Sequence, residues 1–482
     1  WRASSPCRTR AGCDTLHGMS TVGGAATARA PKTPETREQK SWYWYDWANS
    51  AYVTTTATVL FSPYLTSVAT NAACPDLPEG QTCATTLSLF GIPVVPGSLY
   101  FYVVTATTII SAIFLIFVGG IADRSAHPTK VFGIFAWTGA LAAASMFFVT
   151  GTNWQLGVLL LFVANICLGS SLVIYDSLLV RISTPDERDR VSSKGWAFGY
   201  LGGGLLLAIN FVMVAKPSLL GLDKGGAVRV SLLMAGLWWG LFTLIPFRGL
   251  RRVTGAITPA EARETSLVSG SLAQLGGTFR DLWTHYPQTK LFLLAYLFFN
   301  DGIQTVISSS SVYGVKELGF DESVVLAIFL FVQFVAFFGA LLFGRLAARI
   351  GAFRTVLGSL GVWTFIVVVA FVVPAKSIVL FGALALLIGL VLGGSQALSR
   401  SLYSQLVPKG KEAEYFSFYQ AMERGTSWFG TAIFGLVYQM TLSYRAAIVA
   451  LIVFFVLGGV LLSRVRMREG IIQAGNEVPR II

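Results

Sequence analysis

Long apolar stretches alternate with short polar loops along most of this chain. Twelve stretches are long enough for an α-helix to cross a bilayer, whose apolar core takes about 20 residues of helix. Six lie before a polar connector and six after it. The pattern predicts an all-α integral membrane protein with twelve transmembrane helices. We place the spans at 45–69, 99–121, 131–149, 156–180, 195–215, 230–247, 291–313, 324–344, 355–373, 378–399, 416–440 and 446–463.

The composition excludes an ordinary soluble protein. Of the 482 residues, 54% are hydrophobic and 12% are charged, whereas soluble domains carry about 25% charged residues. The formal net charge is +12. In a soluble protein such a charge would suggest a nucleic-acid partner, but here the Lys and Arg residues lie between the apolar runs. We therefore expect a lipid bilayer as partner and no nucleic acid.

The distribution of Lys and Arg predicts the orientation in the membrane. If the N-terminus lies in the cytosol, the cytosolic segments hold 29 Lys and Arg residues and the opposite segments hold 6. Cytosolic loops of membrane proteins are enriched in these residues. We therefore expect a multi-pass protein of the cell membrane with both termini in the cytosol.

The spans and loops divide the chain into five regions. The first region lacks the apolar core of 7–15 residues that a signal peptide requires, so we expect a disordered cytosolic tail. The five regions are this tail at 1–40, an N-terminal six-helix bundle at 41–247, a cytosolic connector at 248–290, a C-terminal six-helix bundle at 291–465 and a second cytosolic tail at 466–482.

The connector carries signals for helices. The segment Thr258-Pro-Ala-Glu261 resembles a helix start, with a capping Thr, a Pro in the first turn and a Glu three residues after the Thr. Further on, apolar residues recur at helical spacing, which is typical of an amphipathic helix on a membrane surface. A plain linker helix is the alternative. The apolar residues are Leu272, Leu275, Phe279, Leu282 and Trp283.

The two sets of six spans carry related loops. The segment Gly119-Gly-Ile-Ala-Asp123-Arg124 follows the second span, and Gly344-Arg-Leu-Ala-Ala348-Arg349 follows the eighth, at an offset of 225 residues. Pro185 after the fourth span and Pro408 after the tenth are 223 residues apart. Two landmarks with nearly equal offsets indicate that the halves are internal repeats.

The segment Gly119-x-x-x-Asp123-Arg124 between spans two and three, in a chain of two six-span halves, resembles the major facilitator superfamily. The resemblance implies the major facilitator fold. It also implies that Gly119, Asp123 and Arg124 take part in a cytosolic latch between the halves, together with Arg349 of the second copy. The second copy departs from the pattern because Ala348 stands at the Asp position.

Four further segments resemble one branch of this superfamily, that of the fungal autophagy-linked vacuole effluxer and its bacterial relatives. This resemblance implies an effluxer of small solutes. The segments are Tyr45-Asp-Trp-Ala-Asn-Ser-Ala-Tyr52, Val191-Ser-Ser-Lys-Gly-Trp-Ala-Phe-Gly-Tyr200, Asn300-Asp-Gly-Ile-Gln-Thr305 and Gly393-Gly-Ser-Gln-Ala-Leu-Ser-Arg-Ser401.

Polar residues inside the spans are candidates for the transport site. An ionisable side chain in the middle of a bilayer costs about 2.5–3.5 kcal/mol on insertion scales. By the superfamily resemblance, spans one, four, seven and ten line the central cavity, and the polar residues fall on these four. A buried structural pair, such as Asp176 with Arg400, is the alternative. The candidates are Asp46, Asn49, Asn165, Tyr175, Asp176, Asp301, Gln304, Gln396 and Arg400.

Two of these residues suggest a mechanism. Asp301 lies about ten residues into its span, near the depth at which transporters bind coupling ions. Arg400 shares a helix face with Gln396 and can bind a carboxylate in a fork. Our hypothesis is that Asp301, with Asp46 as a second candidate, binds and releases a proton while Arg400 receives a substrate carboxylate.

The sequence offers no pattern for catalysis or metal binding. It has neither a Cys-x-x-Cys pair nor a Walker sequence, and its three histidines lie outside the spans. Cys74 and Cys83 share one loop and could form a disulfide if this loop faces an oxidising compartment. We expect no enzyme activity, no cofactor and no metal.

The function expected from these observations is secondary active transport by alternating access. The cargo is a small polar solute. The resemblance to the superfamily branch implies efflux of amino acids, and the hypothesis for Asp301 adds proton coupling. A monomer is expected. The alternatives are a lipid or drug exporter on the same scaffold and a membrane receptor that does not transport.

Overall fold

The computed structural model describes residues 34–76, 83–89, 91–254, 269–425 and 427–482. The compact unit Thr36–Ile482 contains the helices and strands discussed below. Its first helix begins at Arg37, inside the region 1–40 that the sequence predicts as a disordered tail. The rest of that region up to residue 33, and the predicted helix start at 258–261, lie outside the described residues.

Helices of the N-terminal half begin where the local sequence favours a helix start. The side chains of Thr36 and Gln39 form a capping box with each other's backbone N–H, and Pro96 and Pro128 occupy first turns. The elements in chain order are α1 (Arg37–Ala51), η1 (Tyr52–Leu60), α2 (Phe61–Ala73), α3 (Pro96–Asp123), α4 (Pro128–Ser145), η2 (Met146–Phe148), α5 (Trp154–Ile182), α6 (Arg188–Ala215), η3 (Pro217–Leu220) and α7 (Lys224–Gly249).

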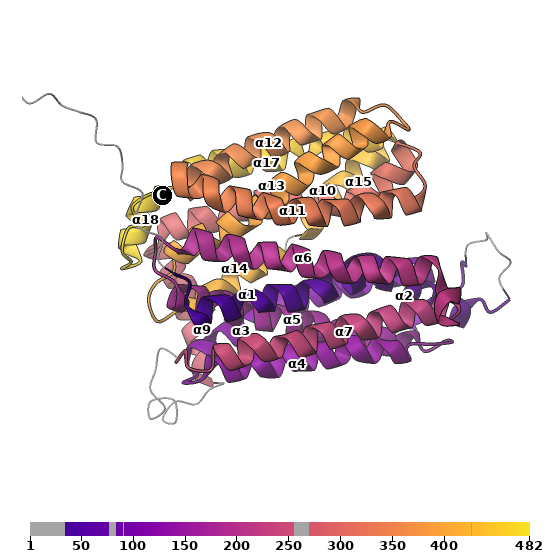
Figure 1. The fold of residues 1–482 in the computed structure, drawn as a ribbon, viewed down its shortest axis with the longest axis horizontal. Helices are drawn as coiled ribbons and strands as arrows, with labels where there is room; N and C mark the ends of the chain where they lie inside the picture. Colours follow the sequence, from indigo (N-terminus) through magenta and orange to yellow (C-terminus); the bar gives the residue numbers. More distant parts are fainter. Residues whose placement is uncertain (1–33, 77–82, 90, 255–268, 426) are drawn as a thin grey trace, which may run out of the picture. The chain divides into compact units, whose positions relative to one another are not determined.

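The C-terminal half repeats this succession of helices (Figure 1). It is preceded by a helix of the connector, α9 (Ser269–Thr284). The following elements are α10 (Pro287–Val312), η4 (Tyr313–Glu317), α11 (Glu322–Ile350), α12 (Ala352–Val372), α13 (Ile378–Gln405), α14 (Glu412–Gly425), α15 (Ser427–Thr441), α16 (Tyr444–Ala450), α17 (Ile452–Ser463) and α18 (Met467–Gln473).

Ten helical segments among the described residues are long and apolar enough to cross a membrane. The two other predicted spans are 45–69 and 416–440. The first changes to a π-helix over Tyr52–Leu60, where the N–H of Phe61 bonds to the carbonyl of Thr56, five residues back. The second consists of α14 and α15, on either side of residue 426. The number of twelve crossings therefore stays a prediction.

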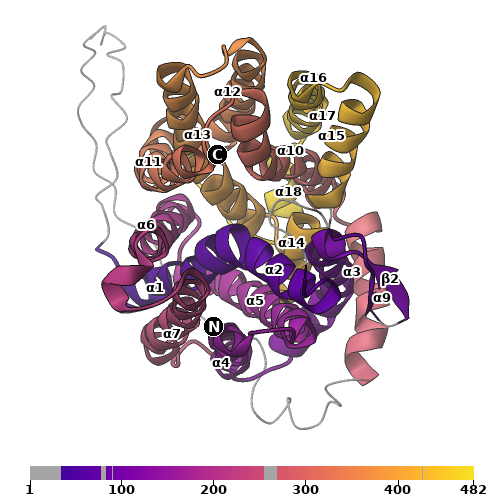
Figure 2. The ribbon, with the colours of Figure 1, turned by 90° about the vertical axis from the view of Figure 1, so that its right-hand side faces the viewer.

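The helices form two bundles that correspond to the predicted halves (Figure 2). The bundles pack most extensively at two pairs of helices, α6 with α11 and α3 with α14, and they also meet where α6 packs on α13 and α5 packs on α14. Close approach at the second pair depends on Gly119, since a Cβ atom there would lie 2.6 Å from the carbonyl oxygen of Ala413. Each bundle thus packs on the other with at least three of its helices.

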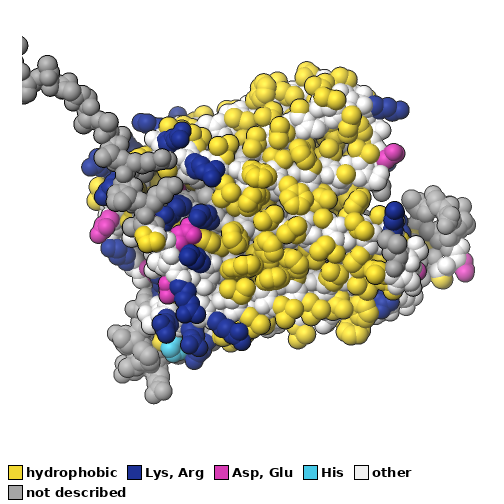
Figure 3. Space-filling view, in the orientation of Figure 1, with side chains coloured by type: hydrophobic (Ala, Val, Ile, Leu, Met, Phe, Trp, Pro, Cys, Tyr) yellow, Lys and Arg dark blue, Asp and Glu magenta, His cyan; other side chains and the backbone are white. Residues whose placement is uncertain are grey.

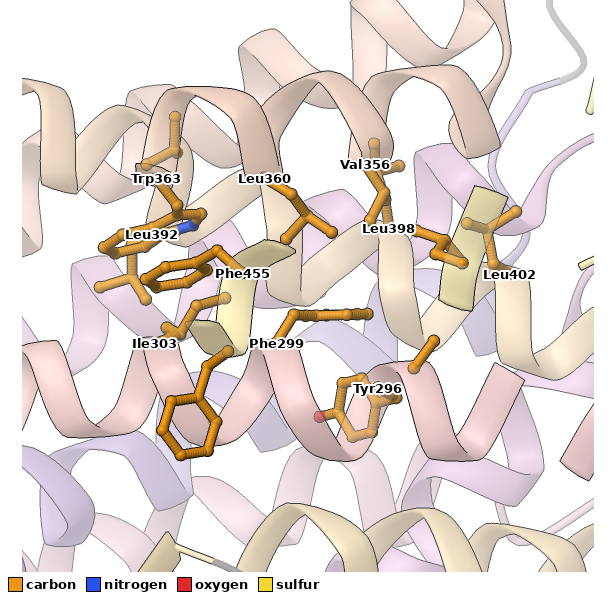
Figure 4. Packing of buried hydrophobic residues seen from close by; sticks show 14 of the residues in the cluster. Tyr296, Phe299, Ile303, Val356, Leu360, Trp363, Leu392, Leu398, Leu402 and Phe455 are labelled. Carbon is orange, nitrogen blue, oxygen red and sulfur yellow. The ribbon is translucent and has the colours of Figure 1, made fainter. Parts of the chain in front are cut away.

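Apolar residues fill the C-terminal bundle. Trp363 of α12 stacks on Phe455 of α17 with ring centroids 5.7 Å apart and planes 4° from parallel. Tyr296, Phe299 and other apolar residues of the bundle pack around this pair (Figure 4). These residues form one continuous hydrophobic core in the C-terminal bundle.

The surface has a wide apolar region between two polar ends (Figure 3). Large apolar side chains such as Phe101, Leu141 and Leu241 are more than 60% exposed, as expected for helices that face lipid. Lys and Arg gather at one end of the molecule, which we call the basic end. It contains the α3–α4, α5–α6, α11–α12 and α13–α14 loops.

Two further segments lie at the basic end. Helix α9 is seen from the side in Figure 2, whereas most spans are seen end-on, so it runs across the direction of the spans. Its Leu282 is buried, but Phe279 and Trp283 are exposed and stack on each other. The side chains of Leu272 and Leu275 lie outside the described residues. The location of α9 on a membrane surface stays a prediction.

The C-terminal segment 466–482 packs against the end of α13. The amide of Asn476 donates to the carbonyl oxygens of Gln405 at 2.9 Å and Val407 at 2.7 Å. These bonds satisfy carbonyl groups that the end of a helix leaves without a partner.

A hairpin and a disulfide lie between α2 and α3, at the end opposite the basic end. Strands β1 (Leu87–Leu89) and β2 (Ile92–Val94) pair antiparallel, with Leu87 opposite Val94. A disulfide joins Cys74 and Cys83, the two cysteines that share this loop.

Candidate functional site

Arg400 of α13 lies between two aspartates of the N-terminal bundle. Its Nη2 is 3.1 Å from Asp46 Oδ2 on α1, and its Nη1 is 3.1 Å from Asp176 Oδ1 on α5. Its Nε and Nη2 also donate to the hydroxyl and carbonyl oxygens of Ser192 on α6. All three charged side chains are at most 9% exposed. We call Asp46, Arg400 and Asp176 the buried triad.

Aromatic rings enclose the guanidinium group of the triad. Trp42 stacks on Tyr175, with ring centroids 4.3 Å apart. The Cζ atom of Arg400 lies 4.7 Å from the ring centroid of Trp42 and 5.4 Å from that of Trp196, within the range of cation–π attraction. The hydroxyl of Tyr175 donates to Asp46 Oδ2 at 2.8 Å. In this conformation the guanidinium therefore has partners on its edges and its faces.

Gly195 of α6 lets this helix approach the triad. A Cβ atom at this position would lie 2.5 Å from Asp46 Oδ2, 2.7 Å from Trp42 Cζ3 and 3.0 Å from Arg400 Nη2. Real Cβ contacts are longer, so a side chain here would displace at least one of the three. The glycine is needed for space rather than for backbone conformation.

A hydrogen-bonded chain leads from the triad into the C-terminal bundle. The amide nitrogen of Gln420 on α14 donates to Asp176 Oδ2 at 2.8 Å and to Glu423 Oε2 at 3.3 Å. Arg424 Nε donates to the amide oxygen of Gln420 at 3.2 Å, and the hydroxyl of Tyr296 on α10 donates to Glu423 Oε2 at 3.3 Å. Gln420 thus connects the triad to a second pair of charged residues.

Gln396 and Asn300 extend this chain between α13 and α10. The amide nitrogen of Gln396 donates to Asn300 Oδ1 at 2.8 Å, and the amide nitrogen of Asn300 donates to the carbonyl oxygen of Glu423 at 3.3 Å. Four helices, α5, α10, α13 and α14, therefore share one polar network with α1 and α6.

Asp301 has different surroundings from the triad. Its side chain is fully buried, and Oδ2 accepts a 2.7 Å hydrogen bond from the backbone N–H of Gly430, in the first turn of α15. Oδ1 has no hydrogen-bond partner among the described residues, and neither has the hydroxyl of nearby Thr305. Asp301 and Arg400 do not contact each other.

Three other predicted residues lie outside the triad's contacts. The amide of Asn49 donates to the carbonyl oxygen of Tyr45 in its own helix, and Asn165 accepts from the hydroxyl of Tyr52 at 3.2 Å. Gln304 is partly buried and makes no hydrogen bond to another described residue. Asn165 and Gln304 remain partly exposed, as do Glu423 and Arg424, whereas the triad is sealed.

Asp123 holds the N-terminus of α14 at the basic end. Its two carboxylate oxygens accept hydrogen bonds from the N–H groups of Ala413 at 3.0 Å and Glu414 at 2.8 Å. Arg181 at the end of α5 lies 3.7 Å from Asp123 and 3.0 Å from Glu412. The first turn of α14 is thus bound by α3 and α5 of the other bundle.

A second group of bonds joins α6 to α13 at the same end. Arg188 donates to the carbonyl oxygen of Ser404 at 2.9 Å and to the side chain of Gln405 at 3.0 Å. The hydroxyl of Ser401 donates to Asp189 at 2.5 Å. We call these contacts, together with those of Asp123 and Arg181, the basic-end clamp.

The predicted latch is only partly formed by the residues that the sequence suggested. Gly119 and Asp123 belong to the clamp, and Arg124 is partly buried at the end of α3. Arg349 is exposed and contributes no bond to the clamp among the described residues. The difference from the first copy is that Ala348 offers no carboxylate to cap a helix.

Comparison with known proteins identifies the family. The model of a protein family described as vacuole effluxer Atg22 like matches residues 35–188 and 181–475. The chain belongs to this family. It is similar to the uncharacterized MFS-type transporter YxiO of Bacillus subtilis (strain 168), with 30% identity over 448 residues that cover 92% of this chain and 99% of the relative.

More distant relatives agree with this assignment. Autophagy-related protein 22-1 of Penicillium rubens is 23% identical over 526 residues, which cover 86% of this chain and 88% of that protein. The solved structure of the major facilitator superfamily proton:xylose symporter XylE has the same fold, with a TM-score of 0.62, 13% identity, and coverage of 89% of this chain and 94% of the other. The Atg22-like chain is therefore a multi-pass membrane transporter of the major facilitator superfamily and not an enzyme.

The four segments that resemble the Atg22-like branch meet at the polar network. They contribute Asp46, Ser192, Asn300 and Arg400, which come from α1, α6, α10 and α13. The sequence did not single out the residues that connect these four. Trp42, Ser192, Tyr296 and Asn300 carry no charge, and Gln420 and Glu423 lie in span eleven, outside the four spans expected to line the cavity. These residues are marked only by their closeness to charged residues on other helices, and the sequence does not contain this information.

Proposed function

We propose that this Atg22-like chain is a secondary active transporter that exports a small polar solute by alternating access of its two bundles. The basic end faces the cytosol in this proposal, with both termini on that side and the cell membrane as location. The excess of Lys and Arg at that end supports the orientation. The chain works as a monomer.

The buried triad carries the proposal. Two carboxylates of one bundle and a guanidinium of the other form ion pairs at the bundle interface. If the bundles separate on this side, as alternating access requires, all these charges lose their partners. Charges in a low-dielectric interior are costly without partners, so a solute or a proton has to replace them. This exchange of partners would couple cargo to conformation.

The chemistry around Arg400 favours a cargo with a carboxylate. Once released from Asp46 and Asp176, its guanidinium could bind a carboxylate in a fork. Trp42, Tyr175 and Trp196 would then offer aromatic faces next to it. Neutral and aromatic amino acids combine both features, and export of amino acids agrees with the effluxer family.

Asp301 is the proposed coupling residue. No cation lies within ion-pair distance of it among the described residues, and its Oδ1 has no partner. A proton would fill this position. Asp46, the second candidate from the sequence, is already paired with Arg400, which favours Asp301.

Counterflow in proteoliposomes tests the proposal. The purified full chain would be assayed with labelled amino acids, sugars, organic anions, a lysophospholipid and a cationic drug. We expect exchange of leucine or tyrosine, and net transport driven by a pH gradient that Asp301→Asn abolishes. Asp321→Asn, a change at an exposed aspartate, is the matched control and leaves transport unchanged.

The other outcomes distinguish the alternatives. Exchange of the lysophospholipid or the drug alone would favour a lipid or drug exporter. Binding without exchange for every compound would favour a receptor. Full pH-driven transport by Asp301→Asn would show that the coupling proton binds elsewhere.

A further inference from the structure

The formal charges of the side chains in the polar network do not sum to zero. Four of them form a chain of alternating sign, in which Arg400 lies between Asp46 and Asp176, and Gln420 connects Asp176 to Arg424. This chain contains two carboxylates and two guanidinium groups and is neutral. Glu423 also contacts Gln420 and is the surplus carboxylate.

Glu423 receives only neutral hydrogen-bond donors. Its Oε2 accepts from Tyr296 and Gln420, while Oε1 makes no hydrogen bond to another described residue. Among the described residues, no Lys, Arg or His nitrogen lies within 4.0 Å of this carboxyl group. Titratable groups of six helices surround it, namely Asp46 of α1, Asp176 of α5, Tyr200 of α6, Tyr296 of α10, Arg400 of α13, and Tyr419 and Arg424 of α14.

The location of Glu423 allows exchange of a proton. The triad is sealed, but Glu423 is partly exposed. An unbalanced negative charge among helices of low polarity is costly, and a proton on the free Oε1 would remove it. We propose that Glu423 carries a proton in this conformation and is a second coupling group, connected to Arg400 through Gln420 and Asp176. This proposal rests on the proposed transport function.

The proton on Glu423 is linked to transport because Arg400 and its two aspartate partners belong to different bundles. Glu423 and Arg400 both belong to the C-terminal bundle, whereas Asp46 and Asp176 belong to the other. Separation of the bundles at the basic end removes both aspartates from Arg400. The guanidinium then has the Glu423 carboxylate as an alternative partner, which favours the ionised form. The proton passes from Oε1 to water in the opened space, and Arg400 stays charged throughout.

Infrared spectroscopy of the purified full chain tests the protonation directly. A protonated carboxyl group has a C=O stretch distinct from that of a carboxylate. At neutral pH we expect one such band to disappear in Glu423→Gln and a different one in Asp301→Asn. Glu317→Gln, which removes an acid paired with Arg445, leaves both bands in place. An unchanged spectrum of Glu423→Gln would overturn the proposal.

A transport assay tests the coupling separately. With labelled leucine as probe, we expect Glu423→Gln to lose uptake driven by a pH gradient and Glu423→Asp to keep it. Full gradient-driven uptake in Glu423→Gln would overturn the coupling role even if its band disappears. If the wild-type chain moves no compound, the proposed function fails, but the infrared result still decides whether Glu423 is protonated.

Discussion

The basic-end clamp and the buried triad both join the two bundles through charged groups, but their surroundings differ. The clamp lies at the end of the spans, where Arg181 keeps 13% of its side chain exposed, and one of its acids caps a helix N-terminus. The triad lies deeper, and Arg400 keeps only 3% exposed.

This difference assigns separate tasks to the two layers. When the clamp opens, its charged groups reach water, which replaces the lost bonds at small cost. When the triad opens, its charges need new partners of opposite sign or bound protons. The clamp therefore sets how easily the basic end opens, whereas the triad sets what has to bind when it opens.

The largest effect is expected at the triad. Arg400→Met leaves Asp46 and Asp176 without a cation, and breaking a buried ion pair costs about 3–5 kcal/mol. The free energy of unfolding in detergent would measure this loss. The triple variant Asp46→Asn/Asp176→Asn/Arg400→Met removes all three charges and should recover most of the stability without recovering transport. Wild-type stability of Arg400→Met alone would show that the ion pairs contribute little.

A smaller effect is expected at the clamp. Asp123→Ala removes a cap from α14, a loss of about 0.5–2 kcal/mol, and should raise the population open at the basic end. Labelling of Ser404→Cys by a maleimide reagent reports this opening because position 404 is fully buried. The background for this experiment replaces Cys7, Cys13 and Cys167 by Ser. Asp76→Ala, at the opposite end, serves as the control. Equal labelling with and without Asp123 would contradict a closing role for the clamp.

The smallest effect is expected outside the clamp, where Lys411 next to α14 lies 3.0 Å from Asp281 of α9. Both side chains are at least 33% exposed, so Lys411→Ala should cost less than about 1 kcal/mol. The hydrogen bond from Lys411 holds the pKa of Asp281 below its usual value. A lowered pKa means that the stabilisation is present above a pH of about 4 and is lost as the pH falls further. Thermal unfolding of both proteins at neutral and acidic pH checks this, and a larger difference at acidic pH would contradict it.

The helices and most of the polar residues could be predicted from the sequence, because a bilayer imposes a simple rule on both. Apolar runs have to be long enough to span it, and Asp46, Asp176, Asp301 and Arg400 stand out against them. The alternative of a structural pair between Asp176 and Arg400 corresponds to their contact in this conformation. The apolar runs do not give the ends of the helices, since α6 begins at Arg188, before the run that starts at 195.

The connections between these residues could not be predicted. Whether Asp176 bonds to Arg400 or to a solute depends on the relative position of the two bundles. Helical periodicity in the sequence carries no information about that position. The symmetry of the repeat suggested Arg349 for the latch, which stays a prediction, because in this conformation Arg349 forms no bond to the clamp among the described residues. The arginines that do form bonds in the clamp are Arg181 and Arg188. They flank Pro185, and in this region the repeat had shown only that Pro185 matches Pro408.

The π-helical segment Tyr52–Leu60 changes how the first span can respond to cargo. A wider turn advances each residue by a smaller angle around the axis than an α-helix does. The side chains of the portion that begins at Phe61 are therefore rotated around the helix axis, compared with the directions that an unbroken α-helix from Asp46 would give them. Tightening this turn into an α-helix would rotate one portion relative to the other and would also lengthen the span, because a tighter helix rises more per residue. Such a change in the first span would couple a rotation to an axial shift between the charged layer and the far surface.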